Sequence, residues 1–283
     1  MAYLLELEKA DDDVQDEPPS RGPLRITELK ISSRRNSLDS PRRRIATIGL
    51  TARHPDVYEP CDDSFALVDA LLADKVNLVE RQPNLCLEVG CGSGYVITSL
   101  ALLMGSECNA HFLATDINEA AAQVTCQTLA AHGVEADVVV TNLVAGLEKR
   151  VSGAIDVLVF NPPYVPTSED EVGMAGLISS WAGGHRGRTV IDRMLAIVDE
   201  LLSSKGLFYL LTLTANNPGE ICQIMQKKGF ASRIIIQRST EEESLHVLKF
   251  WREHVDDLPE NGSPPNFQTS LSAKLSRLAF WRS

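Results

Sequence analysis

The sequence predicts an α/β fold in which helices cover both faces of a mostly parallel, seven-stranded sheet. Between residues 84 and 250, short apolar runs alternate with segments of helical spacing. Strands joined by helices pair in the same direction, because each helix returns the chain to the starting edge of the sheet. The composition is that of an ordinary globular protein, since 44% of the 283 residues are hydrophobic and 23% are charged.

The expected elements begin with a helix ahead of the first strand. Order is expected from residues 56–60, and Asp62, Asp63 or Ser64 can cap a helix that carries apolar residues from Phe65 to Leu72. The elements that follow are a strand at 84–89, a glycine turn at 90–94, a helix at 95–104, a strand at 110–115 leading to Asp116, a helix capped by Asn118 that runs to His132, and strands at 136–141 and 155–160.

The second half of the domain contains a helix at 189–203, a strand at 206–213 and a helix that opens at Asn217-Pro218. Proline suits this position because its fixed φ matches the first turn of a helix. Strands at 232–237 and 244–250 follow. The connection between these two strands is too short for a parallel crossover, so we expect them to be antiparallel.

The chain divides into three regions by composition. Residues 1–53 combine an acidic cluster with a basic, serine-containing run, and their low hydrophobicity and block charge predict a disordered tail. Residues 54–250 form the predicted folded domain. Residues 251–283 are expected to be a flexible tail, with a short basic amphipathic helix near its end as the alternative.

The sequence lacks the usual signals for secretion, membrane insertion and metal binding. Charged residues begin at Glu6 with no long apolar run before them, no stretch approaches the ~20 apolar residues of a membrane span, and the six cysteines form no Cys-x-x-Cys pair. We therefore expect reduced thiols, no membrane span and no bound metal. Cytoplasmic and nuclear localisation is expected. Arg42-Arg43-Arg44 is a candidate nuclear address, and an ordinary charged run of a disordered tail is the favoured alternative.

The negative charge is concentrated in the predicted domain. Residues 54–250 carry 13 basic and 25 acidic side chains, a formal charge of −12, whereas both tails are near neutral. An acidic body repels nucleic-acid phosphates and suits a basic protein as substrate or partner.

Three consecutive strand ends carry residues suited to a nucleoside with an amino-acid tail. The glycines of residues 90–94 let a ligand approach the backbone, and Glu88 favours a cationic or zwitterionic group over a diphosphate. Asp116 follows ~20 residues later, where a carboxylate can bond two ribose hydroxyls. Asn142 and Leu143 can flank an adenine ring. S-adenosylmethionine fits this set, and a tight turn with a simple helix cap is the alternative.

A rigid segment, Asn161-Pro162-Pro163-Tyr164, follows the fourth strand. Each proline fixes its own φ and keeps the preceding residue extended. Asn161 Oδ1 and the Pro162 carbonyl are acceptors that can hold an NH₂ group by its two hydrogens, while Tyr164 packs against a planar acceptor group. Methyl transfer to a weakly nucleophilic nitrogen needs this positioning and no strong general base. A proline-rich strand cap is the alternative.

Together these motifs resemble the class I methyltransferases of the HemK-like branch, which have a Rossmann-like fold. Residues 56–60, 181–188 and 206–210 resemble more closely the eukaryotic release-factor glutamine methyltransferases. The resemblance covers residues 55–250. It implies S-adenosylmethionine-dependent N5-methylation of the glutamine in the Gly-Gly-Gln loop of the eukaryotic class 1 peptide-release factor, a step in translation termination. It also implies a heterodimer with a small zinc-binding activator subunit, held by sheet-edge and apolar contacts.

The resemblance assigns roles residue by residue. The implied cofactor-binding residues are Ser64, Glu88, Gly90, Asp116, Asn142, Leu143 and Asn161, and the implied catalytic and substrate-binding residues are Asn161, Pro162, Pro163 and Tyr164. Two positions depart from the family pattern. Aspartate is usual where Asn142 stands, so bonding to the adenine amino group is expected to weaken. Threonine is usual at Ser64, where the hydroxyl is retained.

Other functions stay open at this point. Members of the family have been assigned histone-lysine monomethylation. Adenine-N6 methylation of nucleic acid would use the same acceptors, although the charge of −12 and the lack of a basic target-recognition domain count against it. A catalytically idle cofactor-binding subunit is disfavoured by the intact Asn161 to Tyr164 segment, while Asn142 leaves room for it.

Overall fold

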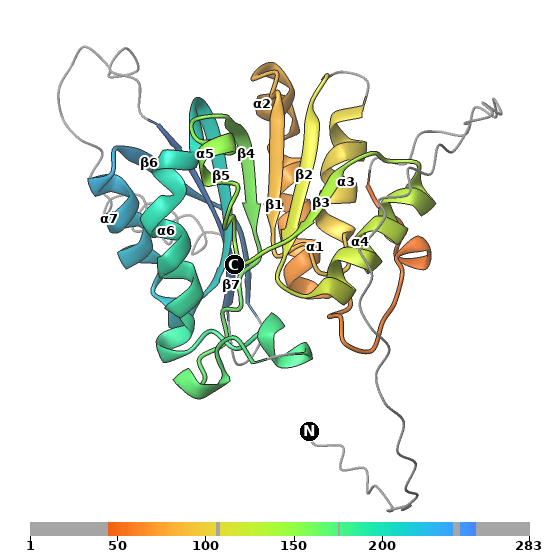
Figure 1. Cartoon of the computed structure of the whole chain (residues 1–283). Coiled ribbons are helices and arrows are strands. Elements are labelled where there is room, and N and C mark those ends of the chain that lie inside the picture. The colour runs from red at the N-terminus through yellow and green to blue at the C-terminus, as the bar shows by residue number, and fades with distance from the viewer. Residues whose placement is uncertain (1–44, 106–107, 175, 240–243, 253–283) are drawn as a thin grey trace, which may run out of the picture. The chain divides into compact units, whose positions relative to one another are not determined.

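The computed structural model describes residues 45–105, 108–174, 176–239 and 244–252, and these contain one seven-stranded sheet (Figure 1). The sheet order is β3-β2-β1-β4-β5-β7-β6. The strands are β1 (Leu85–Val89), β2 (His111–Asp116), β3 (Asp137–Val140), β4 (Ile155–Phe160), β5 (Leu202–Leu213), β6 (Phe230–Ser239) and β7 (Ser244–Arg252). Only β7 pairs antiparallel with its neighbours in this sheet. The predicted fold class is confirmed.

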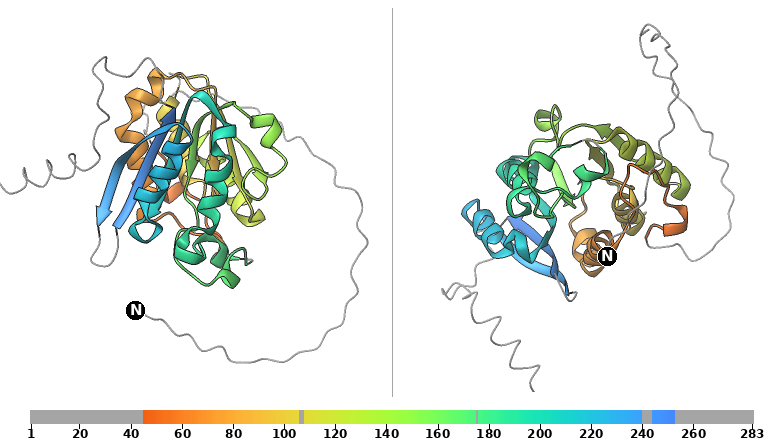
Figure 2. Two further views of the ribbon diagram at one scale, coloured as in Figure 1. Left: turned by 90° about the vertical axis from the view of Figure 1, so that its left-hand side faces the viewer. Right: turned by 90° about the horizontal axis from the view of Figure 1, so that it is seen from below.

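Helices cover both faces of this sheet. They are α1 (Asp62–Ala73), α2 (Lys75–Glu80), α3 (Tyr95–Met104), α4 (Glu119–His132), α5 (Glu148–Val151), α6 (Thr189–Leu201) and α7 (Pro218–Lys227). Figures 1 and 2 show α6 and α7 on the side of the sheet opposite α1 and α3. All six residues of β4 are buried, as expected for a central strand that is covered on both faces. No helix within the described residues is long and apolar enough to cross a membrane.

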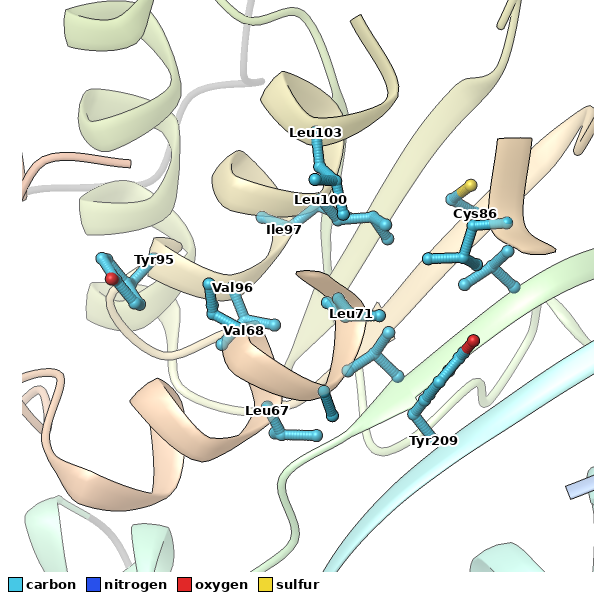
Figure 3. Close-up of a cluster of buried hydrophobic side chains, with 14 of the residues drawn as sticks. Leu67, Val68, Leu71, Cys86, Tyr95, Val96, Ile97, Leu100, Leu103 and Tyr209 are labelled. Atoms are coloured by element: carbon cyan, nitrogen blue, oxygen red, sulfur yellow. The ribbon is translucent and has the colours of Figure 1, made fainter. Parts of the chain in front are cut away.

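One apolar layer lies between the sheet and the helices α1, α2 and α3 (Figure 3). Leu67 and Leu71 of α1 and Ile97 of α3 are fully buried there, against strand residues such as Cys86 and Tyr209. The Tyr209 hydroxyl donates a hydrogen bond to Asp74, so the polar end of this buried ring is satisfied. The layer fixes the start of α1 and the start of α3, which both border the functional site.

The other apolar layer lies between the sheet and the helices α6 and α7. Phe208 of β5 and Phe250 of β7 stack in it with ring centroids 5.6 Å apart. The helices contribute buried residues at helical spacing, namely Ile191, Met194, Leu195 and Val198 of α6 and Ile221 and Met225 of α7. Alternation along each strand therefore supplies both layers, as the pleat of a sheet requires.

Residues 45–57 are ordered, although the disordered tail was predicted to extend to residue 53. The backbone N–H groups of this strap donate to side chains of α3 and α4: Ala46 to Ser99 Oγ, Thr47 to His132 Nε2, and Ala52 to Thr128 Oγ. Ala46 is buried. The predicted start of order was too late because side chains distant in sequence hold this backbone. The rest of the predicted N-terminal tail, and residues 253–283, lie outside the described residues.

Element boundaries follow the predictions closely where the signal is local. Asn118 caps α4 through Ala120 N, and Asn217 caps α7 through Glu220 N. The prediction for α1 was wrong, because Cys61 occupies the N-cap position and makes no side-chain capping bond. β5 begins at Leu202, earlier than predicted, and its pairing with β4 shifts register between Ile155 and Val157.

The buried carboxylate of Asp156 ties together the amino ends of three strands. Asp156 Oδ2 accepts from Asn84 N at 2.7 Å just before β1, and Oδ1 accepts from Ser203 Oγ at 2.5 Å in β5. Lys205 Nζ lies 3.6 Å from the same carboxylate. Asp156 is 4% exposed, so its donors would lose their partner with little compensation from water if it were removed.

We expect Asp156→Ala to lower the free energy of unfolding by about 1–3 kcal/mol, because it leaves the Asn84 N–H and the Ser203 hydroxyl without an acceptor. Urea denaturation followed by circular dichroism measures this. The matched control is Asp170→Ala, which removes an exposed carboxylate and should change stability by less than about 0.5 kcal/mol. Equal effects of the two substitutions would show that Asp156 contributes no more than a surface charge.

Candidate active site

A pocket opens at the carboxyl ends of β1, β2, β3 and β4. Its empty volume is about 1210 Å³, part of it open to solvent. The strap at Asp56 to Tyr58, the start of α1 and the segment between β4 and α6 complete its walls. That last segment lies at the lower end of the view in Figure 1. Ligands of open α/β sheets bind at this edge, because neighbouring parallel strands deliver their following loops to it.

The structure brings all seven predicted cofactor-binding residues to this pocket. They arrive from α1, from β1 and its turn, and from the ends of β2, β3 and β4: Ser64, Glu88, Gly90, Asp116, Asn142, Leu143 and Asn161. Pro163 also lines the pocket. Pro162 is buried, and neither it nor Tyr164 belongs to the described wall.

The glycine turn serves two different purposes. Gly90, Gly92 and Gly94 all have positive φ, at 70°, 50° and 74°. A Cβ on Gly90 would project toward the Asn161 carbonyl, at 3.7 Å, on the floor of the pocket. A Cβ on Gly94 would lie 2.8 Å from Thr125 Cα, so this glycine lets α3 begin directly against α4.

Two acidic residues lie beneath and beside this turn. Glu88 Oε2 accepts from Ile97 N at 2.7 Å, and burial raises the pKa of its carboxyl well above the usual value, with the Asp116 charge adding to the shift. Asp116 Oδ2 accepts from Gly92 N at 2.9 Å and Oδ1 from Asn118 N at 2.8 Å. Burial also raises the pKa of Asp116. Each Asp116 oxygen keeps a lone pair, so the carboxylate can accept from a vicinal diol.

The far end of the pocket contains a residue that the sequence interpretation missed. Arg193 of α6 lines the pocket and donates from Nη2 to Asn142 Oδ1 at 2.8 Å. Because a guanidinium can only donate, this bond leaves the Asn142 NH₂ group as the remaining polar group of that side chain. The neighbouring Leu143 has φ 55°, an unfavourable left-handed conformation for a branched apolar residue. This strained backbone therefore lies in the wall of the pocket.

Asn161 holds an unused acceptor at the end of β4. Its Nδ2 donates to Asp63 Oδ2 at 3.1 Å. Its Oδ1 is buried and has no hydrogen-bond partner among the described residues. An unpaired buried acceptor is costly unless a ligand supplies a donor, so this atom indicates a ligand group that donates a hydrogen bond, such as an N–H.

Tyr164 lies behind Asn161 and not in the pocket wall. The prediction from the sequence was that it packs against the planar group that receives the methyl. Its hydroxyl donates to Asp63 Oδ2 at 3.2 Å, and burial together with the Asp63 charge raises its pKa. Its carbonyl accepts from Asn216 Nδ2 at 2.8 Å. Tyr164 thus connects the proline segment to α1 and to the end of β5.

Residues 181–188 pack against the Asn161 to Tyr164 segment. A Cβ on Gly187 would lie 1.9 Å from the Tyr164 carbonyl, which only glycine permits. Arg188 is 6% exposed and donates to Asp192 and to the Asn216 carbonyl. Residues 181–188, which carry part of the family resemblance, therefore support the Asn161 to Tyr164 segment.

The residues of the pocket fit a nucleoside carrying an amino-acid tail better than a metal ion. Within the described ranges, no group of three or more His, Cys, Asp or Glu side chains could hold a metal. Asp116 offers diol acceptors, the glycine turn leaves space above Glu88, and the unpaired Asn161 Oδ1 awaits a donor.

Comparison with known proteins finds similar methyltransferases. Residues 61–180 match the family model of the methyltransferase small domain. Human methyltransferase HEMK2 is 47% identical over 195 residues, which are 69% of this chain and 89% of the relative. The eRF1 methyltransferase catalytic subunit mtq2 of Schizosaccharomyces pombe is 34% identical, over 70% of this chain and 90% of the relative.

A solved structure is also similar. It is the E. cuniculi Mtq2–Trm112 complex, described as responsible for methylation of the eRF1 translation termination factor. The matched chain is 26% identical with a TM-score of 0.49, and the match covers 70% of this chain and 99% of that one.

Gly94 and Gly92 of the turn allow a stability test. We expect Gly94→Ala to lower the free energy of unfolding by about 1–3 kcal/mol more than Gly92→Ala, because both positions have positive φ and only Gly94 meets backbone within 3 Å. Thermal and urea denaturation of both variants measure the difference. Equal destabilisation would mean that strain in φ, and not the contact with α4, makes Gly94 necessary.

Proposed function

As a member of the HEMK2 family of methyltransferases, to which its 47% identity assigns it, this chain is a methyltransferase, and we propose that it methylates a glutamine side-chain amide with S-adenosylmethionine. The proposed substrate is the glutamine of the Gly-Gly-Gln loop of the eukaryotic class 1 peptide-release factor. The name of the fission-yeast relative, an eRF1 methyltransferase, supports this choice. The observation that carries the proposal is the buried, unpaired Oδ1 of Asn161.

The residues that line the pocket include candidates to contact each part of the cofactor. S-adenosylmethionine, when bound, supplies an electrophilic methyl group on a positively charged sulfur. The Asp116 carboxylate would accept from the ribose hydroxyls, and Leu143 and Asn142 would border the adenine. Gly90 leaves room for the ligand at the floor, and Glu88 and Ser64 offer polar groups for the amino-acid tail.

The Asn161 side chain positions the acceptor nitrogen. Its Oδ1 can accept one N–H of a primary amide, which fixes the direction of the nitrogen lone pair. The same oxygen stabilises the positive charge that develops on nitrogen during transfer. A neutral amide does not have to lose a proton before the methyl transfer. It therefore suits a pocket that offers a hydrogen-bond acceptor. A second grip by the Pro162 carbonyl remains a prediction from the sequence.

Adenine also presents an NH₂ group, and the charge of the domain argues against it. The formal charge of −12 over residues 54–250 repels a phosphate backbone, whereas it attracts a basic protein surface. We therefore place a protein ahead of a nucleic acid as substrate. A histone lysine is the alternative protein acceptor.

We also propose that the chain acts as the catalytic subunit of a heterodimer with a small zinc-binding activator. The fission-yeast relative is named a catalytic subunit. In this chain β3 is an edge strand. The apolar side chains of Val140, the last residue of β3, and Ile117, just after β2, are 51% and 54% exposed. An open strand edge with exposed apolar residues is suited to pairing with another chain.

The substrate proposal is tested by incubating the chain, with and without the activator, with methyl-labelled cofactor and with release factor, histone or duplex DNA. We expect label on the release factor, and none when its Gly-Gly-Gln glutamine is replaced. Asn161→Ala should reduce transfer by at least ~10²-fold while the Kd for S-adenosylhomocysteine changes little, because the residue positions the acceptor. Label on DNA alone would contradict the proposal. Cofactor binding without any transfer would favour an idle subunit.

The pair of Asn142 and Arg193 gives a second test, of the cofactor. In Asn142→Asp one carboxylate oxygen can keep the bond to Arg193 and the other can accept from the adenine amino group. We expect S-adenosylhomocysteine to bind roughly fivefold more tightly, about one hydrogen bond of 1 kcal/mol. Calorimetric titration measures this, with Gln127→Glu as a control that adds the same charge on exposed α4. Unchanged or weaker binding would place adenine away from Asn142.

A further inference from the structure

The carboxylate of Asp63 connects the start of α1 to the acceptor-binding asparagine. Its Oδ2 accepts from Asn161 Nδ2 at 3.1 Å and from the Tyr164 hydroxyl at 3.2 Å. We propose that Asp63 is a positioning residue, which fixes the amide of Asn161 so that its Oδ1 faces the acceptor nitrogen. The role rests on the proposed function, because it requires an acceptor with N–H bonds.

The chemistry of the two side chains determines the orientation of the amide. An ionised carboxylate can only accept hydrogen bonds, so Asn161 must turn its NH₂ group toward Asp63. The carbonyl end of the same planar amide then points the opposite way. This is the oxygen that is buried without a partner. A flipped amide would present NH₂ to the NH₂ of a substrate, and two donors cannot bond.

The carboxylate of Asp63 is itself held in place by burial and by further hydrogen bonds. It is 4% exposed. Its Oδ1 accepts from Ser64 N at 2.5 Å, from Ser64 Oγ at 3.1 Å and from Cys61 Sγ at 3.0 Å. One carboxylate oxygen is thus committed to the start of α1 and the other to the Asn161 to Tyr164 segment. The link crosses 98 residues of sequence.

The charge of Asp63 has a second consequence. A hydrogen bond from Nδ2 to a carboxylate polarises the amide and increases the negative charge on Oδ1, since neighbouring hydrogen bonds reinforce one another in a buried site. A more negative Oδ1 is a better acceptor for an N–H that becomes acidic as positive charge develops on nitrogen. Asp63 therefore affects the transfer step more than ground-state binding.

The first experiment compares Asp63→Asn with wild type in the glutamine-methylation assay, using the heterodimer. The new amide can donate to Asn161 and so favours the flipped, unproductive orientation. We expect kcat to fall by ~10²–10³-fold, while KM for the release factor and the Kd of S-adenosylhomocysteine change by less than about threefold. Asp62→Asn removes an exposed carboxylate one position earlier, and its kcat should stay near wild type.

The second experiment exchanges the two side chains in Asp63→Asn/Asn161→Asp. The new amide can donate to the new carboxylate, whose free oxygen then takes the place of Oδ1. We expect this double variant to have a kcat at least ~10-fold above that of Asp63→Asn. If the two side chains acted independently, the losses of the two single variants would instead multiply. A purely structural role for Asp63 would not produce this recovery.

Four outcomes of these two experiments would overturn the proposal. They are a kcat of Asp63→Asn within threefold of wild type, a parallel rise in KM, multiplicative losses in the double variant, and loss of folding or cofactor binding in both variants. Nuclear magnetic resonance of ¹⁵N-labelled protein tests the bond between Asp63 and Asn161 independently of whether glutamine is the substrate. The Asn161 NH₂ signal is assigned by its loss in Asn161→Ala. Slow proton exchange of this group in wild type and fast exchange in Asp63→Asn support the link, even if glutamine is not the substrate. Fast exchange in wild type contradicts it.

Discussion

Parallel pairing of β1 with β2 and β4, and of β2 with β3, is the constraint on which the rest of the structure depends. It places the carboxyl ends of these four strands along one edge of the sheet, so the side chains that follow the strands lie close together. The register between neighbours sets Val89 beside Thr115 and Phe160. The glycine turn, Asp116 and Asn161 therefore border one space, although they are far apart in sequence.

The two apolar layers make this edge rigid enough for chemistry. Burial of the sheet on both faces leaves the strand ends as the place where polar groups can gather, and several of those groups support one another. Asp63 holds Asn161 and Tyr164, while Asn216 and Arg188 hold the backbone behind them. Two buried side-chain oxygens of the pocket-lining residues, Asn161 Oδ1 and Thr115 Oγ1, have no hydrogen-bond partner among the described residues, so both can bond a ligand.

The sequence allowed prediction of those features whose signal is local. Strand and helix periodicity, the caps Asn118 and Asn217, and the polar residues at strand ends all depend on neighbours within a few positions. Asp63 was interpreted only as a helix cap, because its partner Asn161 is 98 residues away. The bond of Arg193 to Asn142 spans 51 residues and that of Thr47 to His132 spans 85, so no pattern along the chain indicates either.

The place of β7 in the sheet has a consequence for how the protein is made. β7 is the last strand of the described domain, yet it lies between β5 and β6, and β6 pairs with no other described strand. A ribosome that has completed β6 has produced a strand without a neighbour and a β5 whose outer edge is open. Both are templates for association between nascent chains. Synthesis of residues 244–252 supplies the strand that pairs with both, so a chain that stops before them leaves β5 and β6 without their shared partner.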